Sequence, residues 1–280
     1  MGSSSEGWQI GDLSETGPVR EENQDRMCGV RLGLKQLHIV ADGMGGHRGG
    51  ALAAQLTIDG LSRELEQAPS KVSIADLLRQ AFDKTNQHVY EKAHSRDRET
   101  QGMGSTAVLL LITDQTAHIA HVGDSRAYLY RKGRLSRLTT DHTRAQRMVE
   151  AAILTPRQAL DHPSASVLER AIGIKPTIEI DITQIHPINT GDGILLCTDG
   201  LSGYVNDKEI AEILSGGLPV DEIPKRLFDL ALKHESKDNI TIKYLQYGKS
   251  KPTRFGLARL LTWKRKYAIA VIKLIGFFNL

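Results

Sequence analysis

Five aspartates stand where short apolar segments of this chain begin or end, and this placement constrains the fold more than any other sequence feature. Asp42, Asp124 and Asp199 end LHIVAD, HIAHVGD and ILLCTD, whereas Asp25 and Asp238 come just before two further apolar segments. Aspartate has a low strand propensity and is costly to bury without a partner. An Asp-Gly turn explains a single case, but the repeated placement predicts carboxylates that converge on one rim of a packed sheet structure.

The spacing of the apolar residues predicts an α+β fold. Leucine-rich segments with helical spacing predict helices over 49–67, 73–94 and 221–235. The first two follow each other directly, which departs from strict β-α-β alternation and favours sheets and helices in separate layers. Short runs of branched residues predict strands, and these are 37–42, 106–113, 118–124, 127–131, 194–199 and 240–247, with a hairpin turn at Lys132-Gly133.

Composition indicates a folded protein of a reducing compartment. With 280 residues, 40% hydrophobic and 25% charged, the chain can bury a large core. Its two cysteines, Cys28 and Cys197, argue against a disulfide framework and against a Cys-rich zinc site. The segment MGSSSEGWQI lacks the apolar core of a signal peptide. We therefore expect a cytoplasmic protein, with residues 1–10 as an N-terminal extension.

Positive charge is concentrated at the C-terminal end. The chain has a net charge of +3, but eight of its 36 basic residues and none of its 33 acidic residues lie after residue 247. Residues 1–247 therefore carry 28 basic against 33 acidic residues, a net charge of −5. The excess of positive charge belongs to the tail, so it does not predict binding of nucleic acid by the body.

The basic apolar tail, residues 248–280, has three interpretations. Its longest apolar run, 267–280, is interrupted by Lys273 and is shorter than the roughly 20 residues that span a bilayer. An amphipathic helix over 254–278, lying on the anionic surface of the inner membrane, is one interpretation. The second is a helix that docks on the body or on a partner protein, and the third is a junction to another module.

The carboxylates predict a site for hard divalent cations. Clustered carboxylates without His or Cys repel one another unless a cation neutralises them, and oxygen ligands favour Mg²⁺, Mn²⁺ or Ca²⁺ over Zn²⁺. The chain has no EF-hand loop. Gly43 can present its carbonyl oxygen to a cation held by Asp42, and Arg20 can grip a phosphate with two parallel hydrogen bonds. Two ions bridged by a carboxylate commonly hydrolyse phosphate esters, so we predict metal-assisted phosphoryl transfer to water.

Other phosphate chemistries find less support. ADGMGGHRGG (41–50) lacks the last glycine of a dinucleotide-binding loop and the Lys-Ser/Thr of a Walker loop. Neither cysteine lies in a C-x₅-R phosphate loop. His121 is flanked by strand residues and is expected to be structural, whereas polar neighbours place His142 and His162 at the surface or near substrate.

Seven segments in series resemble the PP2C-type (PPM) metal-dependent protein serine/threonine phosphatases, in their bacterial form. The resemblance covers about residues 11–247, and 141–173 is similar to the flap of bacterial members. The spacing around 46–56 and 94–106 is similar to the phosphatases that accompany type VI secretion kinases. The segments are VREENQD (19–25), VADGMGG (40–46), MGSTAV (103–108), VGDSRAYLYR (122–131), LTTDHT (138–143), LLCTDGL (195–201) and KDNIT (237–241).

The resemblance implies a four-layer α-β-β-α sandwich that binds two Mn²⁺ or Mg²⁺ ions. It implies that Asp42 bridges the ions, that Gly43 binds one of them through its carbonyl, and that Asp199 and Asp238 complete the other. Asp124 and Asp199 match the ligands of a third, weaker ion. A water that bridges two ions would then attack the phosphorus in line.

The resemblance also assigns the residues around these ligands. Arg20 matches the phosphate-binding arginine, and Asp25, with Gln24 and Asn239, surrounds the metal ligands and acts mainly through water. Two positions depart from the family. Gln24 replaces a frequent Glu and carries no charge, and Met44 replaces the His that follows Asp-Gly in many eukaryotic members and cannot donate a proton.

The expected activity is hydrolysis of phosphoserine and phosphothreonine on proteins, by a monomeric enzyme that opposes a bacterial Ser/Thr kinase. The non-enzymatic alternative is a pseudophosphatase that binds phosphoproteins without hydrolysing them, against which the intact set of aspartates argues. A third candidate is a partner-switching phosphatase that acts on anti-sigma antagonists. The complete VGDSR and DNIT segments favour the general protein phosphatase.

Overall fold

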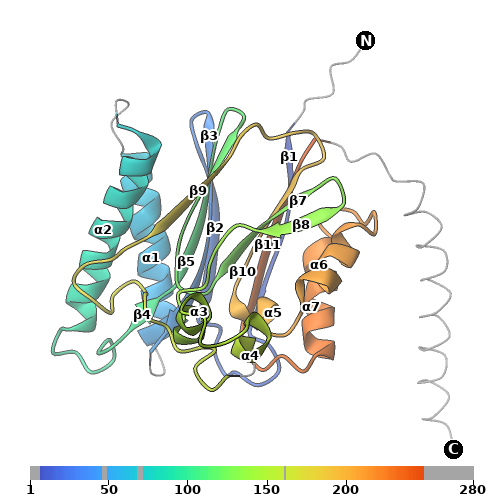
Figure 1. Cartoon of the computed structure of the whole chain (residues 1–280). Coiled ribbons are helices and arrows are strands. Elements are labelled where there is room, and N and C mark those ends of the chain that lie inside the picture. The colour runs from blue at the N-terminus through green and yellow to red at the C-terminus, as the bar shows by residue number, and fades with distance from the viewer. Residues whose placement is uncertain (1–6, 46–48, 68–71, 161, 249–280) are drawn as a thin grey trace, which may run out of the picture.

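Two antiparallel sheets face each other and carry helices on their outer sides, as Figure 1 shows. The structure is a computed structural model, and it describes residues 7–45, 49–67, 72–160 and 162–248. The predicted extension and tail therefore lie largely outside the described residues. The first sheet has the order β1 (Trp8–Glu15), β11 (Ile240–Tyr247), β10 (Gly193–Cys197), β7 (Arg126–Arg131) and β8 (Arg134–Arg137).

The second sheet carries the first pair of long helices. Its order is β2 (Asp25–Leu32), β3 (Lys35–Met44), β5 (Ala107–Thr113), β6 (Thr116–Val122) and β9 (Asp181–Ile185), and the short β4 (Gly104–Ser105) pairs with the end of β3. Helices α1 (Gly49–Glu66) and α2 (Ile74–Ala93) cover its outer face. Helices α5 (Asp199–Ser202), α6 (Asp207–Leu214) and α7 (Ile223–Lys233) cover the outer face of the first sheet. The fold is the expected four-layer α-β-β-α sandwich.

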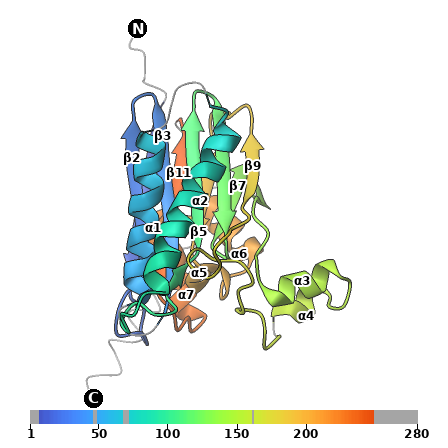
Figure 2. The same cartoon turned by 90° about the vertical axis from the view of Figure 1, so that its left-hand side faces the viewer.

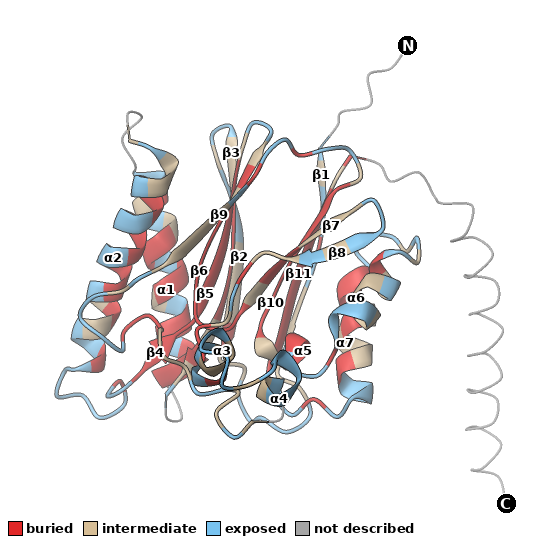
Figure 3. Cartoon of the chain, in the orientation of Figure 1, coloured by how far each residue is buried: buried red, intermediate tan, exposed pale blue. Residues whose placement is uncertain are grey.

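Three apolar cores separate the four layers, because successive side chains of a strand point to opposite faces. In β5, Leu109 and Leu111 pack under α1 and α2, whereas Val108 and Leu110 pack between the two sheets. In β11, Ile242 and its alternate neighbours pack against the helices of the other side. The central strands β5, β10 and β11 are accordingly buried on both faces, which Figure 3 shows as red ribbons through the centre. This explains why β5 is a continuous apolar run without alternation.

The helices begin at residues that satisfy their first backbone amides. Ser73 accepts a hydrogen bond from the amide of Asp76 at the start of α2, at 3.2 Å. Asn206 and Glu209 form a capping box at the start of α6. The three helices predicted from the sequence are confirmed, with ends that differ by at most two residues.

The six predicted strands and the hairpin between β7 and β8 are confirmed. The start of the chain differs from the expected extension, because β1 begins at Trp8 and pairs along its length with β11. Trp8 also packs its ring against Tyr247, with centroids 5.2 Å apart. The polar residues of β1 hide this strand in the sequence, since one face of an edge strand remains in solvent.

The segment expected to form a flap, residues 141–173, holds two short helices, α3 (Arg144–Glu150) and α4 (Pro156–Leu160). Figure 2 shows them standing away from the sandwich. Isolated bridges join the flap to itself and to the body, namely Thr143 with Leu168 and Ser105 with Ile172. Among the described residues, no helix is both long and apolar enough to cross a lipid bilayer.

His38 is a buried polar residue between the two sheets and leads to a first prediction. Neither ring nitrogen has a hydrogen-bond partner among the described residues, and Lys243 of β11 lies nearby. Burial, with the charge of Lys243, lowers the pKa of His38 to about 4. The unfolded chain binds a proton here near pH 6.5, so His38 lowers the free energy of unfolding progressively as the pH falls from about 6.5 to about 4.

Replacing His38 by Val is expected to raise the free energy of unfolding by about 1–3 kcal/mol at pH 7.5, because two unpaired polar atoms leave the core. The gain is expected to grow at pH 5, where the wild type alone suffers the protonation penalty. Urea unfolding of both proteins at pH 7.5 and pH 5 measures this. A gain that is equal at the two pH values would contradict the lowered pKa of His38.

Candidate functional site

An open cleft of about 970 Å³ lies at the end of the sandwich, and residues of both sheets and of the flap line it. Its lining combines carboxylates from both sheets with residues of the loop before β2 and of the flap. Asp42, Asp124, Asp199 and Asp238 all line it, as the sequence predicts, and Asp25 lies beneath, opposite Asp42 in the β2–β3 register. The expected convergence on one rim is confirmed.

Each aspartate reaches the rim from a different element. Asp42 lies near the end of β3, and Asp199 is the first residue of α5, directly after β10. Asp124 lies in the turn between β6 and β7, and Asp238 lies just before β11. Antiparallel neighbours bring alternate strand ends to the same edge of a sheet, so residues distant in sequence meet there.

The carboxylates in and around the cleft repel one another. Burial raises the pKa of Asp42 and of Asp124 well above the ordinary value, and neighbouring carboxylates raise both further. Burial, followed by the charge of Asp238, also raises the pKa of Asp199. Burial raises the pKa of Asp25 to about 7, although a hydrogen bond from Thr198 lowers it. A nearby positive charge is therefore needed to keep this set ionised at neutral pH.

Unpaired carboxylate oxygens identify what the site can hold. One oxygen each of Asp25, Asp124 and Asp199 is buried and finds no hydrogen-bond partner among the described residues. Among the described residues that line the cleft, none is His or Cys. A donor set of oxygen atoms with unpaired carboxylates fits a hard divalent cation such as Mg²⁺ or Mn²⁺. The residues present therefore fit the ions that the sequence predicts.

The end of β3 and the start of α1 approach each other so closely that Gly43 and Gly50 have no room for a side chain. A Cβ on Gly43 would overlap the carbonyl oxygen of Gly50, and a Cβ on Gly50 would overlap the side-chain oxygen of Gln24. The Gly-rich segment therefore serves close packing around Asp42, and the backbone of Gly43 borders the cleft directly.

Replacing Gly43 by Ala is expected to move the end of β3 and with it Asp42. We expect a loss of about 1–3 kcal/mol in the free energy of unfolding, and a loss of about 100-fold in kcat for a displacement of 1 Å. Thermal unfolding and phosphopeptide hydrolysis measure the two effects. Gly216→Ala is the matched control, because its added Cβ would lie 3.1 Å from the nearest atom, a tight contact but far from the overlap with the carbonyl oxygen of Gly50 that a Cβ on Gly43 makes. Equal behaviour of the two variants would contradict this account.

Asn239 anchors the loop that carries Arg20. Its side-chain oxygen accepts a hydrogen bond from the amide of Gln24 at 2.8 Å, and its amide nitrogen donates to the carbonyl oxygens of Thr16 and Glu22 at 2.8 and 3.0 Å. The loop between β1 and β2 is thereby tied to the start of β11. Asn239 and Gln24 thus lie beside the aspartates, where the sequence predicts them.

Arg20, which the sequence predicts to bind the substrate phosphate, is paired with an aspartate in the structure. Its guanidinium donates to both carboxylate oxygens of Asp238, at 2.9 and 2.7 Å, and is not free to receive a phosphate in this arrangement. The side chain nevertheless lines the cleft and is 56% exposed. Arg20 and a cation would compete for the same oxygens of Asp238.

Hydroxyl groups behind the aspartates were not singled out by the sequence analysis. Thr106 accepts a hydrogen bond from the amide of Asp42 at 3.0 Å and is bonded to Ser125 at 2.7 Å. Ser105 donates to the carbonyl oxygen of Asp42 at 3.0 Å, and Thr198 donates to Asp25 at 2.8 Å. All four lie within or beside the motifs MGSTAV, VGDSR and LLCTDGL, which is the signal that could have found them.

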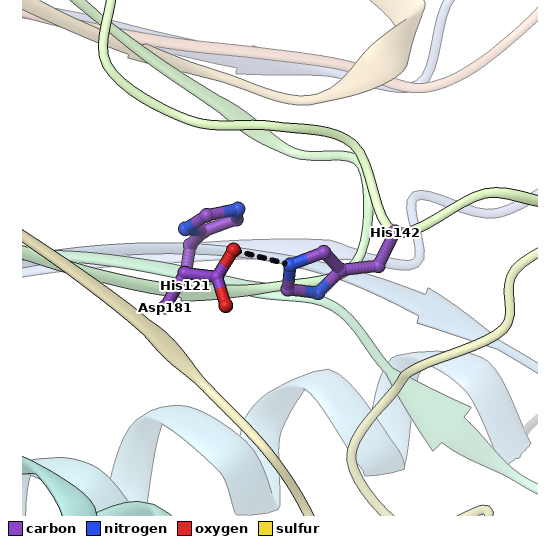
Figure 4. A group of neighbouring side chains, drawn as sticks. All are labelled: His121, His142 and Asp181. Atoms are coloured by element: carbon purple, nitrogen blue, oxygen red, sulfur yellow. Dashed lines mark hydrogen bonds and ion pairs between the residues drawn. The ribbon is translucent and has the colours of Figure 1, made fainter. Parts of the chain in front are cut away.

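A second group of titratable residues lies outside the cleft. His121, His142 and Asp181 bring one nitrogen or oxygen atom each within 4.8 Å of one another. Figure 4 draws these three side chains. His121 is buried, as expected of a structural residue. His142 is only 3% exposed, so the expected position at the surface is wrong. Its polar neighbours in sequence misled the prediction, because its burial comes from packing against residues distant in sequence, such as Asp181.

Comparison with known proteins places these observations in a family. A family model described as "Protein phosphatase 2C" matches residues 19–236. A relative from Listeria monocytogenes named "Serine/threonine phosphatase stp" is 32% identical over 234 residues, which cover 82% of this chain and 92% of the relative.

Solved structures agree with this match. The serine/threonine phosphatase of Streptococcus agalactiae has a TM-score of 0.80 and 31% identity, over 86% of this chain and 99% of that structure. The catalytic domain of the protein phosphatase PstP, solved in complex with two manganese ions, has a TM-score of 0.74 and 31% identity, over 86% of this chain and 99% of that structure.

Proposed function

This chain belongs to the protein phosphatase 2C family and is a protein serine/threonine phosphatase, and from that premise we propose that its cleft aspartates hold the divalent cations of the reaction. Asp42, Asp199 and Asp238, with the carbonyl oxygen of Gly43, would bind two ions, Mn²⁺ or Mg²⁺. Asp124, together with Asp199, would bind a third and weaker ion. The observation that supports this proposal most is that four carboxylates line one cleft, that buried oxygens of Asp124 and Asp199 have no hydrogen-bond partner among the described residues, and that the described lining holds no His or Cys.

The chain's own residues supply binding and orientation. Cations bound here would lower the pKa of a water and neutralise charge that develops on the phosphoryl group. Asp25, behind Asp42, would orient water in the cleft, and its hydrogen bond from Thr198 fixes its carboxylate. Arg20 would grip the phosphate oxygens once Asp238 no longer engages it. Asn239 and Gln24 would hold the loop that carries Arg20 against the cleft.

Phosphorylated proteins are the substrates of this activity, and it counteracts Ser/Thr kinases. The particular phosphoprotein, the cognate kinase and a place in the type VI secretion subgroup stay predictions. The complete set of aspartates argues against the alternative of a pseudophosphatase that binds phosphoproteins without hydrolysing them. The complete set also supports a general protein phosphatase over a partner-switching one.

The direct test is hydrolysis of a phosphothreonine peptide by the full chain, with Mn²⁺ and after removal of metal by a chelator. We expect turnover with Mn²⁺, loss with the chelator and recovery on adding Mn²⁺ or Mg²⁺ back. A wild-type protein that binds the phosphopeptide but does not hydrolyse it at any metal concentration would favour the pseudophosphatase alternative.

We also propose that the enzyme is a cytoplasmic monomer whose residues 254–278 contact an anionic membrane surface. The eight basic residues of the tail, with no acidic ones, support this proposal. Co-sedimentation of the full chain with anionic and neutral vesicles tests it. Reversing the charge of Lys264, Arg265 and Lys266 should abolish binding to anionic vesicles, and equal binding of wild type and variant would refute it.

A further inference from the structure

The cluster of His121, His142 and Asp181 lies where the flap begins, next to the turn that carries Asp124, because the amide of Gly123 donates a hydrogen bond to His142. The rings of the two histidines stack, with centroids 4.6 Å apart. The cluster joins three parts of the chain that are separate in sequence, namely the end of β6, the second residue of the flap segment and the first residue of β9.

The hydrogen bonds of this cluster argue against a metal ion. The amide of Gly123 donates to Nδ1 of His142 at 3.1 Å, so that nitrogen carries the lone pair and Nε2 carries the proton. Nε2 then donates to Asp181, 3.2 Å away, and cannot also bind a cation. The other oxygen of Asp181 accepts a hydrogen bond from Arg170 at 3.1 Å, whose positive charge would repel a cation.

The same bonds couple His142 to the turn that holds Asp124. His142 forms two hydrogen bonds with Gly123, because its own backbone amide also donates to the Gly123 carbonyl oxygen at 2.9 Å. Gly123 has a φ of +96°, and a Cβ there would lie 2.6 Å from the side chain of Thr106. No other residue type fits this backbone without strain, so the turn depends on the bonds that hold Gly123.

A continuous chain of contacts runs from this turn to the centre of the cleft. Ser125, on the other side of Asp124, is hydrogen-bonded to Thr106, and Thr106 accepts the hydrogen bond from the amide of Asp42. His142 therefore lies at one end of a path that reaches Asp42 through these hydrogen bonds and through the backbone of Gly123, Asp124 and Ser125. A displacement of Gly123 would therefore move the carboxylates of both Asp124 and Asp42.

Asp181 ties the two ends of the flap together. One of its oxygens accepts the hydrogen bond from His142 at the flap entrance, and the other accepts from Arg170 near the flap exit. The backbone reinforces this closure, because the amide of Glu169 donates to the carbonyl oxygen of His142 at 2.8 Å. Asp181 itself is held in the sheet, where it pairs with His121 in the β6–β9 register.

We propose that His142 is a positioning residue of this phosphatase, and that Asp181 and Arg170 complete its support. Held in one tautomer between the Gly123 amide and Asp181, His142 sets the position of Asp124 and joins the flap to that turn. The inference rests on the proposed function only for the role of Asp124 as a cation ligand. That His142 holds the turn and the flap together is inferred from the hydrogen bonds alone, which do not require a bound metal.

Two substitutions of His142 each remove one of the two hydrogen bonds of its side chain and keep the other. In His142→Asn the side-chain oxygen lies at the place of Nδ1, so it can still accept from Gly123 but cannot reach Asp181. In His142→Gln the amide nitrogen lies near the place of Nε2, so it can still donate to Asp181 but leaves the Gly123 amide without an acceptor. His142→Ala loses both bonds, and Asp181→Leu removes the acceptor of His142 and of Arg170 together.

Hydrogen exchange of the metal-free proteins is the first readout. We expect the segment around Gly123 to exchange roughly 3- to 10-fold faster in His142→Gln and His142→Ala than in the wild type, and to remain near the wild type in His142→Asn. The two ends of the flap should exchange faster in His142→Asn, His142→Ala and Asp181→Leu. Arg147→Ala is the matched control, because it removes an exposed cross-flap ion pair with Glu169 and leaves the cluster intact.

Calorimetric titration with Mn²⁺ is the second readout. The weakest binding event should weaken by about 10- to 100-fold in His142→Gln and His142→Ala, as when the support of a metal ligand is lost. Tighter sites should change little. Unchanged exchange and unchanged Mn²⁺ binding in folded His142→Gln would overturn the proposal. A wild type without metal-dependent activity would refute the proposed function instead, and the exchange results would still decide the role of His142 in the turn.

Discussion

Asp42→Asn is expected to lower kcat/KM for a phosphothreonine peptide by about 100- to 10,000-fold at saturating Mn²⁺. Asp42 lies among the other carboxylates of the cleft, and burial, followed by the charges of these neighbours, raises its pKa well above the ordinary value. Loss of a bridging charge removes several kcal/mol of stabilisation of the transition state, and each 1.36 kcal/mol corresponds to a factor of ten. Steady-state kinetics across a Mn²⁺ series measures the loss.

The same substitution should stabilise the protein in the absence of metal. A neutral amide removes repulsion among buried carboxylates and can donate a hydrogen bond to Asp199, so we expect the Tm of the metal-free variant to rise by about 2–4 °C per kcal/mol gained. Asp59→Asn on α1 is the matched control, because it makes the same change of charge at an exposed position. Near-normal turnover of Asp42→Asn would refute the assignment of Asp42 as the bridging ligand.

Arg20→Ala is expected to raise KM for the phosphopeptide roughly 10- to 100-fold with a smaller change in kcat. The guanidinium now grips Asp238 with two parallel hydrogen bonds, and the same fork fits two oxygens of a phosphate. A charge-assisted hydrogen bond contributes about 1.5–3 kcal/mol, and the expected range corresponds to the net loss of one such bond at this exposed side chain. Arg20→Lys should recover only part of the loss, because a lysine lacks the planar fork.

A second measurement separates phosphate binding from the pair with Asp238. If Arg20 competes with a cation for Asp238, then Arg20→Ala should bind Mn²⁺ at least as tightly as the wild type in a calorimetric titration, while inhibition by free phosphate weakens. Arg134→Ala on β8 is the matched control, because it removes the same charge at an exposed position away from the cleft. A fall in kcat with unchanged KM would instead assign Arg20 to the transition state.

The sequence predicted the elements well where the pattern of apolar residues was strong. In helices α1, α2 and α7 the apolar residues recur at the spacing of the buried face, and the buried strands are short apolar runs. Their positions along the chain can therefore be predicted from the local sequence. Strand β1 and helix α6 were missed, because both are half-exposed elements and their polar residues weaken the signal. β9 was missed for the same reason, since only Ile185 among its five residues is buried.

The sequence by itself determined the chemistry of the cleft, because the type of side chain at a strand end is a local property. Aspartates at five strand ends, Gly43 beside Asp42 and a nearby Arg20 already specify a site of oxygen ligands for hard cations. Their order along the chain also carries the family resemblance. The close approach of Gly43 to Gly50 explains why those glycines stand there.

Only the tertiary structure decided which of these groups touch one another. The pair of Arg20 with Asp238 joins residues 218 positions apart, and the bond between His142 and Asp181 crosses the whole flap. The burial of His142 is also a product of packing, since its polar sequence neighbours predict the opposite. Such contacts depend on how the two sheets, the helices and the flap pack against one another. This packing brings together residues that are distant in sequence, so local sequence patterns do not predict it.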